Sequence, residues 1–371
     1  MSQQVADEPD LQVLDPELAQ ALAWSHRTLV TSLAGSGLLV ILLVAVGIIA
    51  VPYIKLSPGP MYNTIGSVNG IELISINGTQ TYPVSGELDL VTVNERGGPF
   101  GGLTYPEAFY GWLNPDNTVV PVDALYPPGT TAKEALEENA AQFTSSQSKA
   151  TAAALNELKI PVTTKVVVAV VIPGSPATGK IEPGDVITAV DGKPVNSPDE
   201  LPPLIRSRAP GTVVQISLTS KGAALVVPIT LAANPADPAL GFAGVQTGAQ
   251  YSGPFLITFG LEDVGGPSAG MMFSLGIIDK LTPGELNAGR QIGGTGTISP
   301  EGKVGPIGGM QQKLVAGRDH GSQLFLVPAA NCGDVLEHPQ PTLNVAKVST
   351  LTEAMDVITK WKSGSPDLPR C

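Results

Sequence analysis

The sequence is poor in histidine and in charged and aromatic residues, and these shortages weigh against several classes of function. Only three histidines occur in 371 residues, His26, His320 and His338. Their scarcity argues against a Ser-His-Asp hydrolase and against a histidine-rich metal site. Charged residues make up 15% of the chain and the net charge is −12, with no cluster of Lys or Arg. A nucleic-acid binder normally carries a basic stripe, so we expect no nucleic-acid partner.

Several short functional motifs are also missing. The chain contains no H-E-x-x-H, no C-x-x-C and no G-x-x-x-x-G-K-[ST] segment, so we predict no metal, no cofactor and no ATPase domain within it. The two cysteines, Cys332 and Cys371, would be free thiols in the cytosol. Outside the cytosol an even count of cysteines favours one disulfide.

One long uncharged stretch dominates the N-terminal part. Residues 28–54 carry no charge between Arg27 and Lys55, and their centre is apolar on all sides. About 20 residues suffice to span a bilayer as a helix. We therefore predict a single transmembrane helix over 28–54, preceded by a short tail, 1–27. A cleaved signal peptide is the alternative, but it usually has a basic start and a shorter apolar run. The flanking charges do not fix the orientation.

Periodicity predicts the regular elements that follow. Alternation of apolar and polar residues indicates strands at 68–77 and 87–93. A segment rich in Ala, Glu, Gln and Lys predicts one long helix, or two shorter ones, over 132–158, with Thr130 or Thr131 as the N-cap and Glu134 as the capping-box partner. After Pro161 come short β-rich runs separated by turn residues, at 165–172, 185–190, 213–219 and 224–231.

The segment 171–195 resembles a PDZ domain of the kind attached to bacterial secreted and membrane proteases. The matching residues are Gly174-Ser175-Pro176-Ala177, Gly184-Asp185-Val186-Ile187 and Asp191-Gly192. A helix is expected around 197–208, followed by two strands. The resemblance implies a PDZ domain over 162–233, which would bind a peptide as an added strand at its sheet edge. A small structural domain without a ligand is the alternative.

The last region resembles the proteolytic domain of Lon proteases. It contains Gly-Pro-Ser-Ala-Gly at 266–270, Thr-Gly at 295–296 and Pro-Ile-Gly-Gly-x-x-x-Lys at 306–313, in the order of that family. The resemblance implies that Ser268 is the nucleophile and Lys313 the general base, with Thr295 orienting the lysine amine. Two positions depart from the Lon pattern: Gly265 stands where Lon has Asp, and Thr297 where Lon has Glu.

The chemistry of a serine–lysine pair explains these residue types. A serine hydroxyl needs a base to remove its proton, and lysine serves only when neutral. Lys313 lies in an apolar helix start, where burial would lower its pKa. Gly266 and Ala269 are small residues beside Ser268 that would let a substrate approach. A helix predicted over 269–278 would offer backbone N–H groups to an oxyanion. Ser146-x-x-Lys149 matches another catalytic pattern, but we expect it on a solvated helix face.

Further resemblances indicate the domain order. The segments 85–93 and 138–158 resemble the early part of a Lon proteolytic domain. Residues 57–66 resemble the post-membrane segment of membrane-anchored, PDZ-containing Lon-like proteases of Gram-positive bacteria. We therefore predict an α+β protein in which a PDZ domain, 162–233, is inserted into a Lon-like proteolytic domain made of 55–161 and 234–371. A separate membrane-proximal domain over 55–161 is the alternative.

Together the resemblances imply a single-pass, ATP-independent membrane serine endopeptidase, with its N-terminus in the cytoplasm and its body outside. Its substrates would be unfolded segments, termini or loops of proteins, selected by the PDZ domain. In that compartment Cys332 and Cys371 would form a disulfide that ties the C-terminal tail to the protease domain. Because Lon proteolytic domains form rings, a homo-oligomer is also expected. The alternatives are a PDZ scaffold with a silent Lon-like domain and a structural assembly protein.

Overall fold

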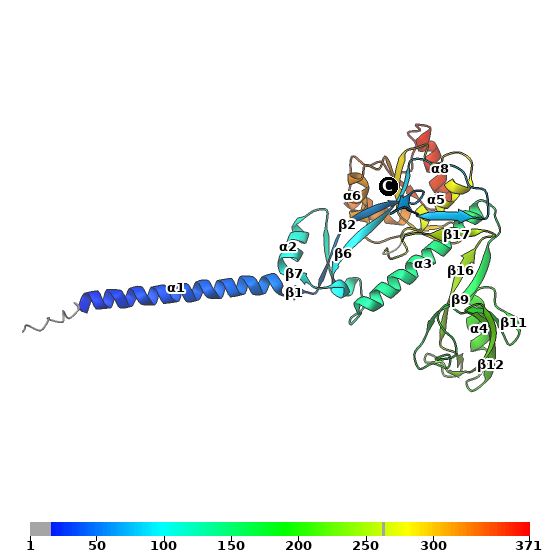
Figure 1. Ribbon diagram of the computed structural model, residues 1–371, viewed down its shortest axis with the longest axis horizontal. Helices are drawn as coiled ribbons and strands as arrows, with labels where there is room; N and C mark the ends of the chain where they lie inside the picture. The colour runs from blue at the N-terminus through cyan, green and yellow to red at the C-terminus, as the bar shows by residue number, and fades with distance from the viewer. Residues whose placement is uncertain (1–15, 262–263) are drawn as a thin grey trace, which may run out of the picture.

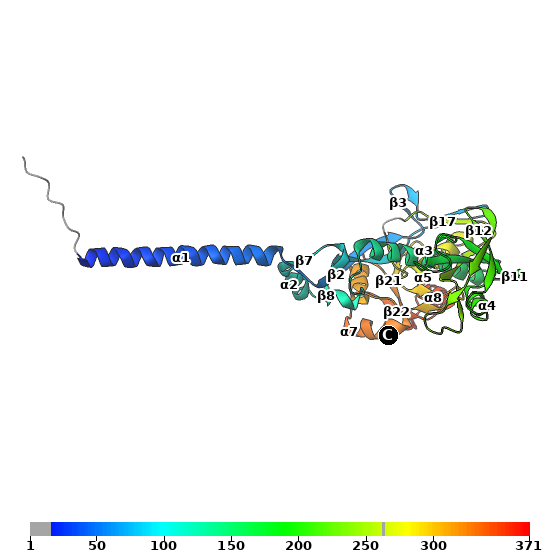
Figure 2. The same ribbon diagram turned by 90° about the horizontal axis from the view of Figure 1, so that it is seen from below.

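A long helix projects from a mixed α+β body. The computed structural model describes residues 16–261 and 264–371, so residues 1–15 of the predicted tail lie outside the described part. Helix α1 (Pro16–Ile48) runs away from the body as a single rod in Figure 1 and Figure 2. The helix ends before residue 54, because Pro52 lacks an N–H to continue it and because β1 (Ala50–Val51) pairs with β7 (Leu103–Thr104).

Helix α1 has the length and composition of a membrane span. Within the described residues, Arg27–Ile48 is the one helical segment long and apolar enough to cross a bilayer. Between residues 27 and 48 the side chains are exposed except that of Ala45, which is half-buried, so the body leaves this apolar surface uncovered. A signal sequence near an N-terminus would share these properties.

The body is built on a six-stranded sheet in the order β22-β21-β18-β6-β2-β8. The strands β22, β21, β18 and β6 are parallel, whereas β2 and β8 are antiparallel to their neighbours. The bounds of these strands are β2 (Tyr53–Asn63), β6 (Glu87–Gly97), β8 (Thr118–Pro121), β18 (Gln291–Gly294), β21 (Leu324–Pro328) and β22 (Val345–Val348). The middle strands are buried on both faces, which explains why β21 is a continuous apolar run.

Helices cover both faces of this sheet. The helices of the body are α2 (Tyr105–Leu113), α3 (Ala132–Glu157), α4 (Leu201–Arg206), α5 (Gly270–Leu281), α6 (Met310–Asp319), α7 (Cys332–Glu337) and α8 (Leu351–Lys362). Helices α3, α5 and α8 share one large core with Leu88 and Leu90 of β6. Helix α6 packs on the opposite face with Val91 and Phe325. Because side chains of a strand alternate between faces, β6 contributes to both cores.

A second, wholly antiparallel sheet has its own core and contains β13, β12, β10, β9 and β16 in that order, with β11 paired to β10. Its strands are β9 (Thr163–Val171), β10 (Val186–Val190), β11 (Lys193–Pro194), β12 (Val213–Ser220), β13 (Ala223–Thr230) and β16 (Val245–Ser252). It lies on the side of the body away from α1 (Figure 1). Strand β16 pairs with β9 along its length, so the sheet extends beyond residue 233, where the sequence placed its end. The helix expected around 197–208 is shorter and follows a 3-10 turn (Pro198–Glu200).

The expected strand at 68–77 is instead broken by a turn. It is divided into β3 (Ser67–Val68), β4 (Ile71–Glu72) and β5 (Ile74–Asn77). Asn69 and Gly70 between the first two strands have φ values of 52° and 80°, a pair of left-handed residues that makes a tight hairpin. The other short pairs are β5 with β17 (Leu256–Phe259), β14 (Ala232–Ala233) with β15 (Gly241–Phe242), and β19 (Thr297–Ile298) with β20 (Val304–Gly305).

Helix α3 connects the two sheets. Its N-terminus carries the predicted capping box, which is confirmed: Glu134 N–H donates to Thr131 Oγ1 at 3.3 Å, and the Glu134 carboxylate accepts from Thr131 N–H at 2.9 Å. Further along, Ser148 Oγ accepts a 2.7 Å hydrogen bond from the N–H of Tyr251 on β16, and α3 packs on α5. Segments that precede and follow the antiparallel sheet in sequence therefore belong to one body. Strand β6, which precedes that sheet, pairs with β18, which follows it.

A disulfide joins Cys332, the first residue of α7, to Cys371, with Cα atoms 5.1 Å apart and a sequence separation of 39. Closing a loop of this length restricts the unfolded chain.

We expect the Cys332→Ser/Cys371→Ser variant to lose about 2 to 4 kcal/mol of unfolding free energy, measured by urea denaturation in detergent. As a control, a reducing agent should lower the stability of the unaltered protein and should leave that of the variant unchanged. Equal stability of the two proteins without the reducing agent would contradict the expectation.

Candidate active site

Ser268 lies in a loop that α3 holds in place before α5 begins. The N–H of Gly266 donates to the carbonyl of Asn139 at 3.0 Å, and Ser146 Oγ donates to the carbonyl of Pro267 at 2.9 Å. The expectation that Ser146 faces solvent is thus wrong: its side chain is buried against the serine loop. Asn139 stands in no recognisable motif, and the Ser146-x-x-Lys149 pattern does not point to the serine loop, so the sequence alone could not find this support.

Small residues let the serine loop pack closely. Gly266 has φ +83°, a backbone conformation that favours glycine. A Cβ on Gly270 would lie 2.7 Å from the Ile298 side chain and 3.1 Å from the Ile298 backbone nitrogen, so only glycine fits there. Ala269, the N-cap of α5, is buried. The helix expected over 269–278 is observed as α5, one residue later at its start and longer at its end.

Lys313 enters the site from the first turn of α6, on the other side of the sheet. The N-cap of α6, Gly309, has left-handed dihedrals (φ 68°, ψ 33°) and lies against Val93 of β6. Its carbonyl accepts the N–H of Lys313 at 3.1 Å. The lysine is only 3% exposed. Its Nζ lies 2.7 Å from Ser268 Oγ, so the structure brings together the two residues that the motifs had paired.

Thr295 completes a compact polar group. It follows β18 and is buried, and its Oγ1 accepts from Lys313 Nζ at 3.1 Å while donating to the carbonyl of Ser268 at 3.2 Å. The N–H of Gly296 also donates to the Ser268 carbonyl, at 2.9 Å. The serine backbone and the lysine amine are therefore fixed by the same threonine hydroxyl.

Burial sets the protonation state of the lysine. It lowers the pKa of Lys313 from 10.5 to about 7, because the charged amine is removed from water. No other cause contributes to this shift. At neutral pH a large fraction of the amine is therefore uncharged and can accept a proton.

The start of α5 offers backbone donors near the serine. Among the residues that the structure describes, no hydrogen bond uses the N–H of Ser268 or of Ala269. Both groups lie where the positive end of a helix begins. The N–H of Gly266, by contrast, is already engaged by Asn139, so this glycine shapes the loop and does not offer a free donor.

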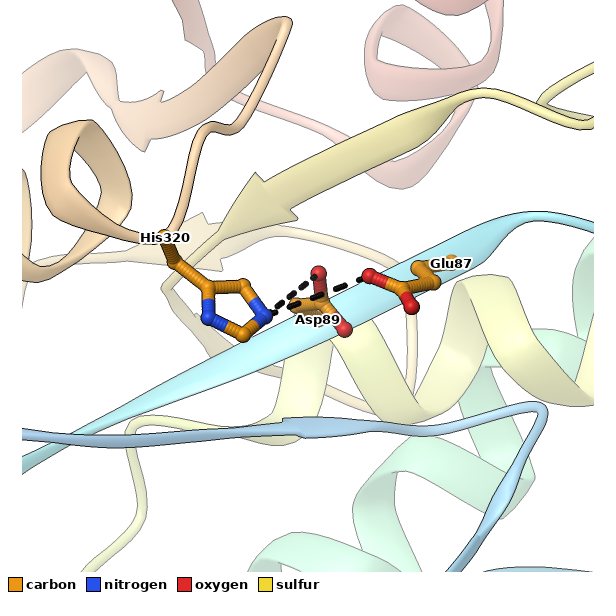
Figure 3. Close-up of side chains that lie close together, drawn as sticks. All are labelled: Glu87, Asp89 and His320. Carbon is orange, nitrogen blue, oxygen red and sulfur yellow. Dashed lines mark ion pairs between the residues drawn. The ribbon is translucent and has the colours of Figure 1, made fainter.

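A second polar cluster lies at the far end of α6. The imidazole of His320, just after α6, points toward the carboxylates of Glu87 and Asp89 on β6 (Figure 3). Its Nε2 lies 3.9 Å from Glu87 Oε2 and 4.0 Å from Asp89 Oδ2. Within the described part of the chain, these three side chains form the group whose donor atoms lie close enough together to hold a metal ion, and carboxylate with imidazole suits Zn²⁺ or Mn²⁺.

This cluster was not predicted from the sequence. Glu87 and Asp89 are two apart on a strand and so share a face, which is a signal visible in the sequence. The approach of His320 from a distant helix is not. Asp89 is 1% exposed. Desolvation by burial raises its pKa to about 6, with a smaller opposing effect from the hydrogen bond that Gln291 donates.

Two protein-family models match the chain. Residues 141–231 match the PDZ domain, and residues 260–361 match the Lon protease (S16) C-terminal proteolytic domain. The second match contains Ser268, Thr295 and Lys313. The chain therefore combines a PDZ domain with a Lon-type proteolytic domain, in an α+β fold with an apolar N-terminal helix. These findings support a protease that carries a PDZ domain.

The similarity to curated relatives covers about a quarter of this chain. A Lon protease of Roseiflexus castenholzii is 34% identical over 106 residues, covering 28% of this chain and 13% of that protein. A Lon protease of Haemophilus influenzae is 37% identical over 93 residues (24% and 11%), and that of Mycolicibacterium smegmatis is 31% identical over 93 residues (25% and 12%). The chain thus matches only about a tenth of the length of these Lon proteases.

Solved structures also include similar chains. The PDZ domain of an SdrC-like protein from Listeria monocytogenes is 26% identical, with a TM-score of 0.21, over 22% of this chain and 85% of that one. A chain from Geobacillus thermodenitrificans is 30% identical, with a TM-score of 0.20, over 22% of this chain and 93% of that one.

The raised pKa of Asp89 predicts a pH-dependent stability. An aspartic acid with a folded pKa of about 6 binds its proton more tightly folded than unfolded, so its effect on stability becomes more favourable as pH falls from about 7 to about 5. Over that interval we expect the unaltered protein to gain about 1 kcal/mol of unfolding free energy relative to Asp89→Asn. Urea denaturation in detergent at both pH values measures this difference. The exposed Asp356→Asn should behave like the unaltered protein, and a parallel pH response of Asp89→Asn would contradict the assignment.

Proposed function

We propose that this protein is a membrane-anchored, ATP-independent serine endopeptidase that uses a Ser268–Lys313 dyad. The observation that carries the proposal is the buried Lys313 amine, 2.7 Å from the hydroxyl of Ser268. The order of the Ser, Thr and Lys motifs and the Lon-type family match support the same activity. Hydrolysis of a peptide bond through an acyl-enzyme is the reaction that such a pair performs.

The hydrogen bonds give each group a role in proton transfer. Because the hydroxyl proton of Thr295 is directed to the Ser268 carbonyl, its oxygen accepts an N–H of Lys313. The lone pair of the neutral amine is then free for the Ser268 hydroxyl. As Ser268 Oγ bonds to the substrate carbonyl carbon, its proton passes to Lys313 Nζ. The resulting ammonium returns that proton to the leaving amine when the peptide C–N bond breaks.

Hydrolysis of the acyl-enzyme uses the same groups, with water in place of Ser268 as the nucleophile and Ser268 as the leaving group. Lys313 takes a proton from water as the water oxygen attacks the ester, and gives it to Ser268 Oγ when that bond breaks. The N–H groups of Ser268 and Ala269 would stabilise the oxyanion of each tetrahedral intermediate. Gly266 contributes by keeping the approach free of side chains.

The remaining features define where the enzyme works and on what. The chain has no phosphate-binding loop for ATP, so we propose that its substrates are protein segments that need no unfolding: termini, loops and unfolded chains. The PDZ domain would capture them as an added strand. The apolar helix would anchor the protein in the cell membrane, with the N-terminus in the cytoplasm and the body outside. The Cys332–Cys371 disulfide supports that oxidising location.

We further propose that the PDZ domain is an insertion in the Lon-type domain. Strand β6, before the insertion, pairs with β18, which follows it, and α3 and α5 share one core. On this division the proteolytic domain begins after the membrane helix and resumes after β16. A homo-oligomer remains part of the proposal, by resemblance to the Lon family.

Substitution of either dyad residue should abolish activity without unfolding the protein. We expect Ser268→Ala, Lys313→Met and Lys313→Arg to slow cleavage of an unfolded, fluorescently labelled protein by roughly 10³-fold or more. Arginine stays protonated throughout the neutral pH range and so cannot act as a base. The assay uses the full chain in detergent, with and without ATP.

Ser363→Ala and Lys360→Met, both exposed on or beside α8, are the matched controls and should cleave normally. A fluorophosphonate probe, followed by intact mass, tests the nucleophile without choosing a substrate: one adduct should form and should be absent in Ser268→Ala. Unchanged cleavage in the dyad variants would contradict the mechanism. Failure of both cleavage and labelling in the unaltered protein would favour the non-catalytic PDZ scaffold.

The pH dependence of the rate should report the lysine. With a Lys313 pKa of about 7, the fraction of neutral amine rises with pH, so kcat/KM should increase through about pH 7 and level off above about pH 8. Below the pKa the rate should fall about tenfold per pH unit. Intrinsic fluorescence across the same range shows whether the fold is retained. A flat profile through this interval would contradict Lys313 as the base.

A further inference from the structure

Helix α2 presents an apolar face that the rest of the chain leaves open. The exposed large apolar side chains of this helix are Tyr105 (53%), Phe109 (62%), Tyr110 (67%), Trp112 (73%) and Leu113 (59%). At about 100° per residue they cover one broad side of the helix. An amphipathic helix of a soluble body would turn its apolar side inward. Because the apolar side of α2 points outward, we expect another molecule to cover it.

The opposite side of α2 is fixed to the body. Gly111 is buried, and a Cβ there would lie 2.9 Å from Lys55 Cδ and 3.0 Å from Val119 Cγ2, so the glycine lets α2 pack tightly on β2 and β8. The one charged residue of the helix, Glu107, accepts from Thr104 N–H at 3.0 Å and pairs with Arg96 at 2.6 Å. The exposed face of α2 is therefore uncharged and cannot rotate inward.

The chain places this face at the end of the apolar helix α1. Ala50 pairs with Thr104, and α2 starts at the next residue, Tyr105. Helix α1 also contacts α2 and β7 directly, and α2 lies beside the inner end of α1 in Figure 1 and Figure 2. The span Arg27–Ile48 has 22 residues, about 33 Å of helix, which matches a hydrocarbon core of about 30 Å. When α1 spans a bilayer, the start of α2 must lie at the headgroup layer.

We propose that α2 docks onto the phospholipid leaflet from which α1 emerges, with Phe109, Trp112 and Leu113 inserted at the boundary between headgroups and acyl chains. Tyrosine and tryptophan are favoured at that depth because one end of each ring system is polar. Since the face is uncharged, docking depends on apolar burial and not on anionic lipid. With two attachments, α1 and α2, the body would hold a fixed orientation on the membrane. The proposal rests on the proposed anchoring by α1.

Depth-dependent quenching of Trp112 tests this docking. The full chain carrying Trp24→Phe and Trp361→Phe keeps Trp112 as its sole tryptophan, and is reconstituted into neutral phosphatidylcholine vesicles. Lipids brominated near the headgroup end of the acyl chain should quench most of its fluorescence, with blue-shifted emission and little change on adding salt. The control chain, Trp24→Phe/Trp112→Phe, keeps Trp361 on α8, whose emission should not be quenched.

The outcomes separate docking from anchoring. If alkaline carbonate extracts the chain from the vesicles, α1 does not anchor it, and the proposal loses its basis. Retention with unquenched, red-shifted Trp112 emission would overturn the docking alone. Retention with blue-shifted but unquenched emission would also overturn it, because the face would then be covered by protein, such as a second copy of the chain.

Discussion

The uncharged amine of Lys313 is the constraint on which the rest of the site depends. A lysine held inside the fold with a pKa of about 7 destabilises the folded state at neutral pH by on the order of 4 kcal/mol, because in the unfolded chain the same amine is charged. This cost grows as pH falls from 10.5 toward 7 and is constant below it. The large core around α5 and the central sheet must offset it. The pairing with Ser268 and Thr295 gives the amine hydrogen-bonding partners that carry no charge.

The central sheet explains how distant segments meet at one point. Helix α5 lies on one face and α6 on the other, so Ser268 and Lys313 approach each other around the end of β18, where Thr295 stands. Helix α3 adds support from before the antiparallel sheet, through Asn139 and Ser146. A segment that precedes the antiparallel sheet in sequence therefore shapes the loop of a serine that follows that sheet. The same helix contacts β16 through Ser148, which gives the two sheets a direct mechanical connection.

The elements nearest the apolar helix α1 have a different composition from the candidate site. Around the site the small residues Gly266, Ala269 and Gly270 let backbones approach, whereas α2 exposes aromatic rings and uses Gly111 to press against the body. The body is thus attached rigidly to the segment that follows α1. With the proposed anchoring, such an attachment would hold Ser268 and Lys313 at a set height above the bilayer and would restrict the proposed substrates to segments near the membrane surface.

The sequence by itself determined the apolar helix and the strands and turns of the PDZ segment, and it singled out Ser268, Thr295 and Lys313 as candidate site residues, because each depends on local periodicity, turn residues or a motif of fixed spacing. It misjudged the extent of the antiparallel sheet, since β16 joins β9 across a long connection. It placed Ser146 in solvent, because the helix pattern does not say which face a distant loop will cover. The approach of His320 to Asp89, the 2.7 Å contact of the dyad and the outward face of α2 were decided only by tertiary structure. Each depends on how segments far apart in the chain pack against one sheet.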